Sequence, residues 1–166
     1  DLSAQLSNDC DLQFMDAKSK DGHSVLLHST AHLMAQAVKR LFPKTKVTIG
    51  PYLENRFYYD FDVETPFSEE DLAKIEAEMV KISNENLEII HEVKSRDEAL
   101  SFFSKIKEDY KVEIINDLDK DEILKVYSQG EFTDLCRGPH VPSTGTIKHF
   151  KLLSSSAAYW LSLIHI

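Results

Sequence analysis

The chain has 166 residues, which is enough for one domain with its own hydrophobic core. Its 28 acidic residues exceed its 19 basic ones and give a formal net charge of −9, which argues against a module that holds a nucleic-acid backbone by bulk positive charge. A hydrophobic fraction of 42%, a charged fraction of 28% and a mean hydropathy of −0.31 are typical of a folded globular protein, and argue against a disordered or membrane-spanning chain.

The negative charge is concentrated in one stretch. Residues 60–98 hold 13 acidic and 4 basic side chains, whereas the rest of the chain holds 15 of each. We interpret this stretch as containing solvated helix faces. Residues 133–151 reverse the balance, with three basic side chains against one acidic side chain. The two cysteines lie far apart and no signal peptide opens the sequence, so we expect no disulfide framework and a cytoplasmic protein.

Hydrophobic spacing predicts a helix over residues 24–42, which Pro43 ends. Strands are expected at 46–49 and 56–63, joined as a hairpin through Gly50 and Pro51.

Capping signatures at Ser68 with Asp71 and at Ser95 with Glu98 predict an acidic helix and a short helix ending near residue 106. The expected strands in this half of the chain are 87–93, 110–115, a hairpin at 122–128, and 145–153. Irregular alternation of strands and helices with short connections predicts an α+β fold, a single compact domain whose helices pack on an antiparallel or mixed sheet.

Two histidines on the first predicted helix are candidates for chemistry. His28 and His32 lie at i and i+4, so their imidazoles share one helix face and can share a metal ion, a water or a substrate group. For the pair alone, two half-exposed structural histidines are the more common outcome. Ser29 stands where the glutamate of a zinc-protease H-E-x-x-H motif would be, so that motif is absent.

The segment 134–140 adds a thiol and a third imidazole. Gly138 and Pro139 interrupt regular structure, so Cys136 and His140 are expected on a loop. With His28 and His32 they form a set of four donors suited to tetrahedral Zn²⁺. The same groups also suit metal-free catalysis, in which a neutral histidine acts as a general base. The residues alone leave both open. Taken alone, Lys111 is expected to face solvent.

Several motifs occur in the order found in the editing domain of bacterial-type threonyl-tRNA synthetase, which this chain resembles from about residue 25 to 160. They are HSTAH at 28–32, IGP at 49–51, FYYD at 57–60, DLCRGPHVP at 134–142, HFKL at 149–152 and AYW at 158–160. The chain is also similar to the editing region of alanyl-tRNA synthetases, which shares the paired histidines and the Cys-x-x-x-His but binds zinc there. Arg56 departs from the family, which usually has glycine before Phe-Tyr-Tyr.

The resemblance implies an aminoacyl-tRNA ester hydrolase that removes serine from mischarged Ser-tRNA(Thr). It implies that His28 and His32 position or activate a water, that Cys136 and His140 shape the pocket, and that Lys111 offsets developing charge or holds the ribose. The full implied set is catalytic His28, His32, Cys136, His140, Lys111 and Asp134, with Tyr59 and Arg137 binding substrate. No metal is expected in the threonyl branch. Zinc held by His28, His32, Cys136 and His140 belongs to the alternative, an alanyl-type trans-editing deacylase.

The expected organisation is a lead-in at 1–22, the editing domain at 23–160 and an apolar, non-native tail at 161–166. Motifs for ATP binding and ligation are absent, so the expected partners are the acceptor end of tRNA(Thr) carrying serine and the other domains of a parent synthetase, with no membrane. A third reading, from another class, is a non-catalytic interaction module stabilised by metal.

Overall fold

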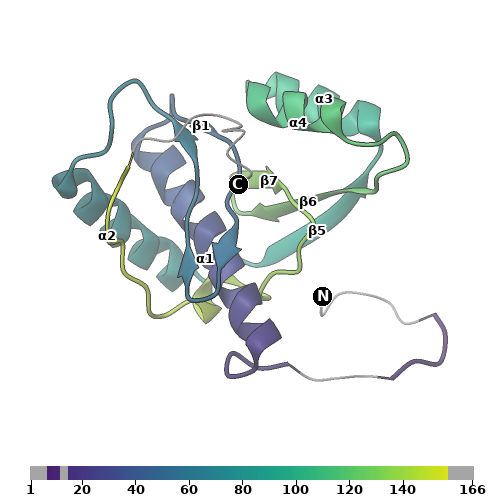
Figure 1. Ribbon diagram of the computed structural model, residues 1–166, viewed down its shortest axis with the longest axis horizontal. Helices are drawn as coiled ribbons and strands as arrows, with labels where there is room; N and C mark the ends of the chain where they lie inside the picture. The colour runs from purple at the N-terminus through teal and green to yellow at the C-terminus, as the bar shows by residue number, and fades with distance from the viewer. Residues whose placement is uncertain (1–6, 12–14, 157–166) are drawn as a thin grey trace.

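The computed structural model describes residues 7–11 and 15–156. The AYW motif, the tail at 161–166 and parts of the 1–22 lead-in lie outside these residues, so the expected domain bounds stay predictions. Figure 1 shows how the elements are arranged. In chain order they are α1 (Lys20–Leu41), β1 (Lys46–Val47), β2 (Tyr52–Leu53), β3 (Arg56–Phe57), β4 (Phe61–Asp62), α2 (Glu69–Glu85), β5 (Ile89–Lys94), α3 (Arg96–Lys105), α4 (Asp109–Asp117), β6 (Leu124–Gln129), β7 (Phe132–Leu135) and a 3₁₀ turn (Thr144–Thr146).

The two long helices, α1 and α2, pack side by side and form the main core (Figure 1). Helix α2 begins with the predicted capping box, in which Ser68 and Asp71 satisfy each other's backbone N–H groups. Its apolar stripe faces α1, and Ile75, Met79 and Ile82 are at most 1% exposed. The predicted acidic helix with a buried apolar stripe is therefore present, but it packs on α1 and not, as expected from the sequence, on a sheet.

The largest sheet has the order β5-β6-β7 and is antiparallel throughout. Strand side chains alternate between the two faces, and here each face has its own helical cover. Val126 and Leu135 pack with α3 and α4 on one face. On the other face, Phe132 joins the α1 core and Gln129 hydrogen-bonds Gln36 of α1 at 2.9 Å. Asp134 shares this second face with Phe132, so the register of β7 directs its carboxylate toward α1.

Residues 46–62 form two short nested ladders. The outer ladder pairs Lys46 with Asp62, and the inner one pairs Tyr52 with Phe57, so the predicted hairpin is present but divided into two ladders. Gly50 lies between them, and a Cβ there would be 2.1 Å from the Tyr59 ring. The glycine therefore allows Tyr59 to fold inward, where it is 7% exposed.

Three local predictions were wrong. Residues 110–115, expected as a strand, lie in α4, because its apolar residues face α3 at helical spacing despite their β propensity. Residues 145–153 form the end of the 3₁₀ turn and irregular chain, not a strand. The second hairpin turns at Gly130, later than expected, because Leu124–Gln129 is one continuous strand.

The α+β class with antiparallel sheets is confirmed. Within the described ranges, no helix combines the length and hydrophobicity needed to cross a bilayer.

Candidate active site

Helix α1 presents its two histidines at different depths. The rings of His28 and His32 have centroids 5.0 Å apart and meet edge-on, as the i, i+4 spacing allows. His32 is 2% exposed and lies in the interior. His28 is half-buried and forms part of a pocket wall.

The loop after β7 brings the thiol and the third imidazole to the same helix. Gly138 adopts φ 68°, in the left-handed region, and a Cβ there would be 1.9 Å from Tyr127 Oη. The turn places Cys136 Sγ 3.0 Å from His140 Nε2. The Gly138 N–H donates to the same sulfur at 3.2 Å. The expected loop thus forms, and it turns both side chains toward α1.

The three imidazoles form a compact cluster with the thiol. The His140 ring centroid lies 4.4 Å from that of His28 and 4.2 Å from that of His32. One donor atom from each of His28, His32, Cys136 and His140 lies within 4.8 Å of the others. Tetrahedral zinc separates its N and S ligands by about 3.3 to 3.6 Å. The set therefore fits zinc in ligand type, and its widest pair would have to close by about 1 Å.

A buried polar network of Tyr59, Lys111 and Asp134 lies behind His32. Lys111 Nζ is 2.5 Å from Asp134 Oδ1, and Tyr59 Oη donates to Asp134 Oδ2 at 2.5 Å. Lys111 Nζ also donates to Tyr59 Oη at 3.2 Å and to the carbonyl of Thr48. Asp134 Oδ2 lies 3.5 Å from His32 Nε2, which links the network to the histidines.

The burial of Lys111 corrects the expectation that it faces solvent. The side chain is 1% exposed, because residue 111 lies on the inner face of a helix, α4, and not on a strand. Its charge has a partner of opposite sign at contact distance, which a buried ammonium group requires.

Burial governs protonation across the site. It lowers the pKa of His28, and it lowers the pKa of His32 and of His140 well below the usual value. Repulsion between protonated rings acts in the same direction on His32 and His140, as does Lys111 on His32. The Asp134 charge opposes the shift at His28 and His140. Burial, followed by the Asp134 charge, raises the pKa of the Cys136 thiol to about 12. Burial also raises the pKa of Tyr59. At neutral pH the cluster therefore contains neutral imidazoles and a protonated thiol.

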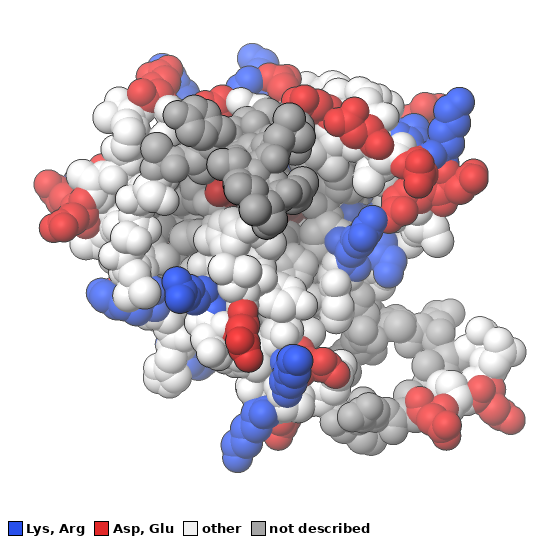
Figure 2. Space-filling view, in the orientation of Figure 1, with Lys and Arg blue, Asp and Glu red and all other residues white. Residues whose placement is uncertain are grey.

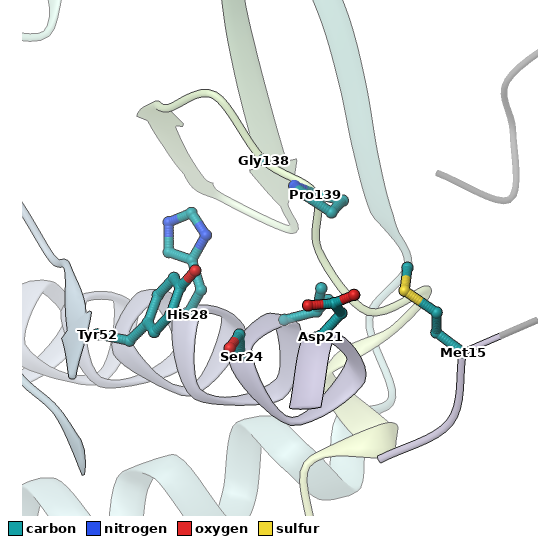
Figure 3. A pocket seen from close by; sticks show the side chains of 8 residues that line it. Met15, Asp21, Ser24, His28, Tyr52, Gly138 and Pro139 are labelled. Atoms are coloured by element: carbon teal, nitrogen blue, oxygen red, sulfur yellow. The ribbon is translucent and has the colours of Figure 1, made fainter. Parts of the chain in front are cut away.

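A pocket of about 280 Å³ opens beside His28 (Figure 3). Figure 3 shows the His28 ring and the Tyr52 ring close together over α1, with Gly138 and Pro139 across from the helix. The other lining residues are Met15, Asp21, Ser24 and Val25. Among the clustered residues His28 is the one that lines this pocket, so it is placed to meet a bound molecule.

Arg137 is the predicted site residue that is not brought to the cluster. Its side chain is 81% exposed and forms an ion pair with Glu122 at 3.0 Å. Sequence reasoning missed Ser29, whose hydroxyl lies 3.0 Å from His140 Nδ1. A serine between two histidines carries no signal of that contact, because the contact depends on where the distant loop docks.

Charge on the visible face is mixed. Figure 2 shows acidic and basic side chains interspersed over the described part of this face. A surface of this kind offers local contacts to a nucleic acid, not one long basic track.

Comparison with known proteins relates the chain to aminoacyl-tRNA synthetases. The family described as "Threonyl and Alanyl tRNA synthetase second additional domain" matches residues 124–158, which include β6, β7 and the loop with Cys136 and His140. Over 160 residues, 96% of the chain, it is 54% identical to the threonine-tRNA ligase of Symbiobacterium thermophilum and 56% identical to that of Pelobacter propionicus. Each match covers 25% of the relative. The threonine-tRNA ligase of Fusobacterium nucleatum is 53% identical over 161 residues.

Residues 124–158 are thus similar to the additional domain that threonyl- and alanyl-tRNA synthetases share. The relatives, all matched over nearly the whole chain, confirm the resemblance to the editing region of threonyl-tRNA synthetase. The chain spans about a quarter of the length of the curated relatives it matches.

Proposed function

We propose that this domain hydrolyses mischarged Ser-tRNA(Thr) within a threonyl-tRNA synthetase. Serine lacks one methyl group of threonine, and one such group gives a binding site only about 1 to 3 kcal/mol of discrimination. A ligase specific for threonine therefore needs a second site that destroys the seryl product. The observation that carries the proposal is the half-buried, neutral His28 on a pocket wall, backed by His32, His140 and the buried polar network.

In the proposed reaction a water attacks the ester carbonyl that joins serine to the terminal ribose. His28 takes the water proton, which its lowered pKa permits at neutral pH because the ring is uncharged. The carbon–oxygen ester bond then breaks, the leaving ribose oxygen takes the proton from His28, and free serine and the uncharged His28 ring result. His32 lies behind His28, 3.5 Å from Asp134, and helps to position the water.

The buried polar network supplies the fixed charges of the site. Asp134 accepts from Tyr59 and Lys111 and lies against His32, so it stabilises any positive charge that develops on the histidines. Lys111 acts through Asp134 and Tyr59, to which it is bonded. Cys136, protonated at neutral pH, shapes the cluster and does not act as a nucleophile.

The expected substrate is the acceptor end of tRNA(Thr), bound in the cytoplasm. The three basic side chains between 133 and 151 suit contact with the tip of a tRNA, and Arg137 is exposed and accessible to its phosphates. Because the net charge is −9, we expect the other parts of the synthetase to supply most of the tRNA affinity. This chain alone should bind tRNA weakly and with strong salt dependence.

A second candidate function, zinc-dependent deacylation of the alanyl type, is favoured by one observation, the proximity of the four donor atoms. His28, His32, Cys136 and His140 would hold the ion, which would activate a bound water. Metal analysis of protein purified without chelator separates the two. One zinc per chain, with activity lost on chelation, favours the second candidate.

The test is deacylation of Ser-tRNA(Thr), Thr-tRNA(Thr) and Ala-tRNA(Ala) by this chain, alone and in place of the matching region of the Symbiobacterium thermophilum ligase. We expect selective loss of serine, impaired in His28→Ala, His32→Ala and Lys111→Ala. Lys81→Ala, at a side chain 69% exposed on α2, is the control. Unimpaired rates in all three variants would overturn the assignment. Absence of any deacylation, with unfolding on metal removal, would favour a non-catalytic module.

A further inference from the structure

Ser29 is fully buried and joins helix α1 to the loop that carries the thiol. Its hydroxyl makes three contacts: 2.8 Å to the carbonyl of Val25, 3.0 Å from the N–H of Val141, and 3.0 Å to His140 Nδ1. Its exposed fraction is 0%. One small side chain thus connects the two elements that supply the imidazole cluster.

The Ser29 hydroxyl has one proton to donate, which settles the direction of each bond. The Val25 carbonyl is an acceptor only, so the proton lies between the two oxygens, since without it their lone pairs would oppose each other at 2.8 Å. The Val141 N–H is a donor only and uses one lone pair of the serine oxygen. On the His140 bond, therefore, Ser29 accepts and Nδ1 donates.

We propose that Ser29 is a positioning residue that holds His140 as the Nδ1–H tautomer, with the Nε2 lone pair directed at Cys136. The contacts of the sulfur agree with this direction. Cys136 Sγ accepts from the Gly138 N–H at 3.2 Å, so its own proton is available to donate to Nε2 at 3.0 Å. The result is a chain of donors that runs in one direction from Gly138 through Cys136, His140 and Ser29 to the carbonyl of Val25.

This tautomer decides what His140 offers to the cluster. If Nε2 carried the proton instead, that N–H would point at the Cys136 sulfur. The Nε2 lone pair would then be missing from the set of donor atoms that His140 forms with His28 and His32. With Nδ1 protonated, the His140 ring is fixed by Ser29 on one side and by the thiol on the other. The tautomer assignment rests on the hydrogen bonds alone, and its effect on deacylation rests on the proposed function.

The test is the tautomer of His140 in the 166-residue chain after dialysis against EDTA, read from the ¹⁵N shifts of its two ring nitrogens and their long-range couplings. We expect the protonated-nitrogen shift at Nδ1. In Ser29→Ala, Nδ1 loses its acceptor, and we expect the population to move toward Nε2–H. We also expect deacylation to fall by up to about 100-fold, because His140 loses the bond that positions its ring. Ser29→Thr keeps the hydroxyl and should restore the tautomer.

Thr30 provides a matched control. Its hydroxyl makes the same bond one position along, to the Leu26 carbonyl at 2.7 Å, and is 3% exposed. Thr30→Val removes that hydroxyl at nearly constant volume and should leave the His140 tautomer unchanged. An Nε2–H tautomer in the wild-type chain, or an unchanged tautomer in folded Ser29→Ala, would overturn the inference. If Ser29→Ala does not fold, the wild-type spectrum decides. Loss of deacylation activity from the wild-type protein would count against the proposed function and leave the tautomer assignment intact.

Discussion

Lys111 and Asp134 form an ion pair whose side chains are only 1% and 2% exposed, although one comes from α4 and the other from β7. Two charges in the interior stabilise a fold only when each keeps its partner, because desolvation of an unpaired charge costs several kcal/mol. Tyr59 completes the pair by donating to Asp134. The pair fixes how α4, the sheet and the 46–62 segment meet behind His32.

Replacing Lys111 with Met should therefore destabilise the domain strongly. The variant keeps the length of the side chain but leaves the Asp134 carboxylate buried without its cation, and we expect a loss of about 3 to 5 kcal/mol in the free energy of unfolding. Urea unfolding measures it. Arg137→Met is the control, because that residue's ion pair with Glu122 is at the surface and should contribute at most about 1 kcal/mol. Equal effects of the two substitutions would contradict the buried pair.

Because Gly138 lies so close to Tyr127, the effects of substitutions at these two residues on the unfolding free energy should not add. Gly138→Ala places a Cβ 1.9 Å from Tyr127 Oη at a φ of 68°, so both a clash and backbone strain result. We expect a loss of about 2 kcal/mol or more in unfolding free energy and displacement of Cys136 from His140. Tyr127→Phe removes the oxygen but leaves ring carbons Cζ and Cε2 at 2.4 and 2.9 Å from that Cβ, so it should relieve only part of the clash and none of the backbone strain. A double-mutant cycle with no coupling would show that the two residues do not meet.

Short sequence motifs correctly predicted where two of the helices begin. The pairs Ser68 with Asp71 and Ser95 with Glu98 predicted the beginnings of α2 and α3, because a capping box is written in four consecutive residues. The strand predicted at 110–115 was wrong because local propensity does not decide the structure there. Tyr, Val and Ile favour strands in isolation, but packing of Ile115 against α3 decides in favour of helix.

In the candidate site, too, the local features were predictable from the sequence and the long-range contacts were not. His28 and His32 were paired by helical spacing alone, and Gly138 and Pro139 predicted a loop. Ligand chemistry suggested that His28 and His32 could join Cys136 and His140, and the family resemblance supported it, but no local pattern relates residues more than 100 positions apart. The contact between Ser29 and His140 is of this kind, which is why it emerges only from the folded chain.

Cys136 should resist alkylation while the domain is folded. With a pKa of about 12, only about one thiol in 10⁴ is ionised at pH 8, and the thiolate is the form that reacts. Cys10 is exposed. We expect iodoacetamide to modify Cys10 at least about 100-fold faster, as followed by peptide mass spectrometry. Unfolding in urea should remove the difference, and comparable rates in the folded chain would mean that Cys136 is ionised.

The buried histidines predict a loss of stability on mild acidification. His32 and His140 have a pKa below the usual 6.5 in the folded state, because burial disfavours the charged ring. Below pH 6.5 the unfolded chain binds protons that the folded chain does not, so acid favours unfolding. Each such histidine adds about 1.4 kcal/mol per pH unit to the slope, and His28 acts in the same direction.

Urea unfolding at fixed pH values between about 7 and 5 tests this, because most carboxylates stay ionised in that window. We expect the free energy of unfolding to fall across it, with the steepest part below about pH 6.5. His32→Gln should reduce the slope by about one proton, whatever its effect on absolute stability. Proton uptake on unfolding at about pH 5.5, measured by potentiometry, should show the same difference. A stability that is constant or rises toward pH 5 would mean that these imidazoles are already charged in the folded protein, and would also remove the neutral base on which the proposed hydrolysis depends.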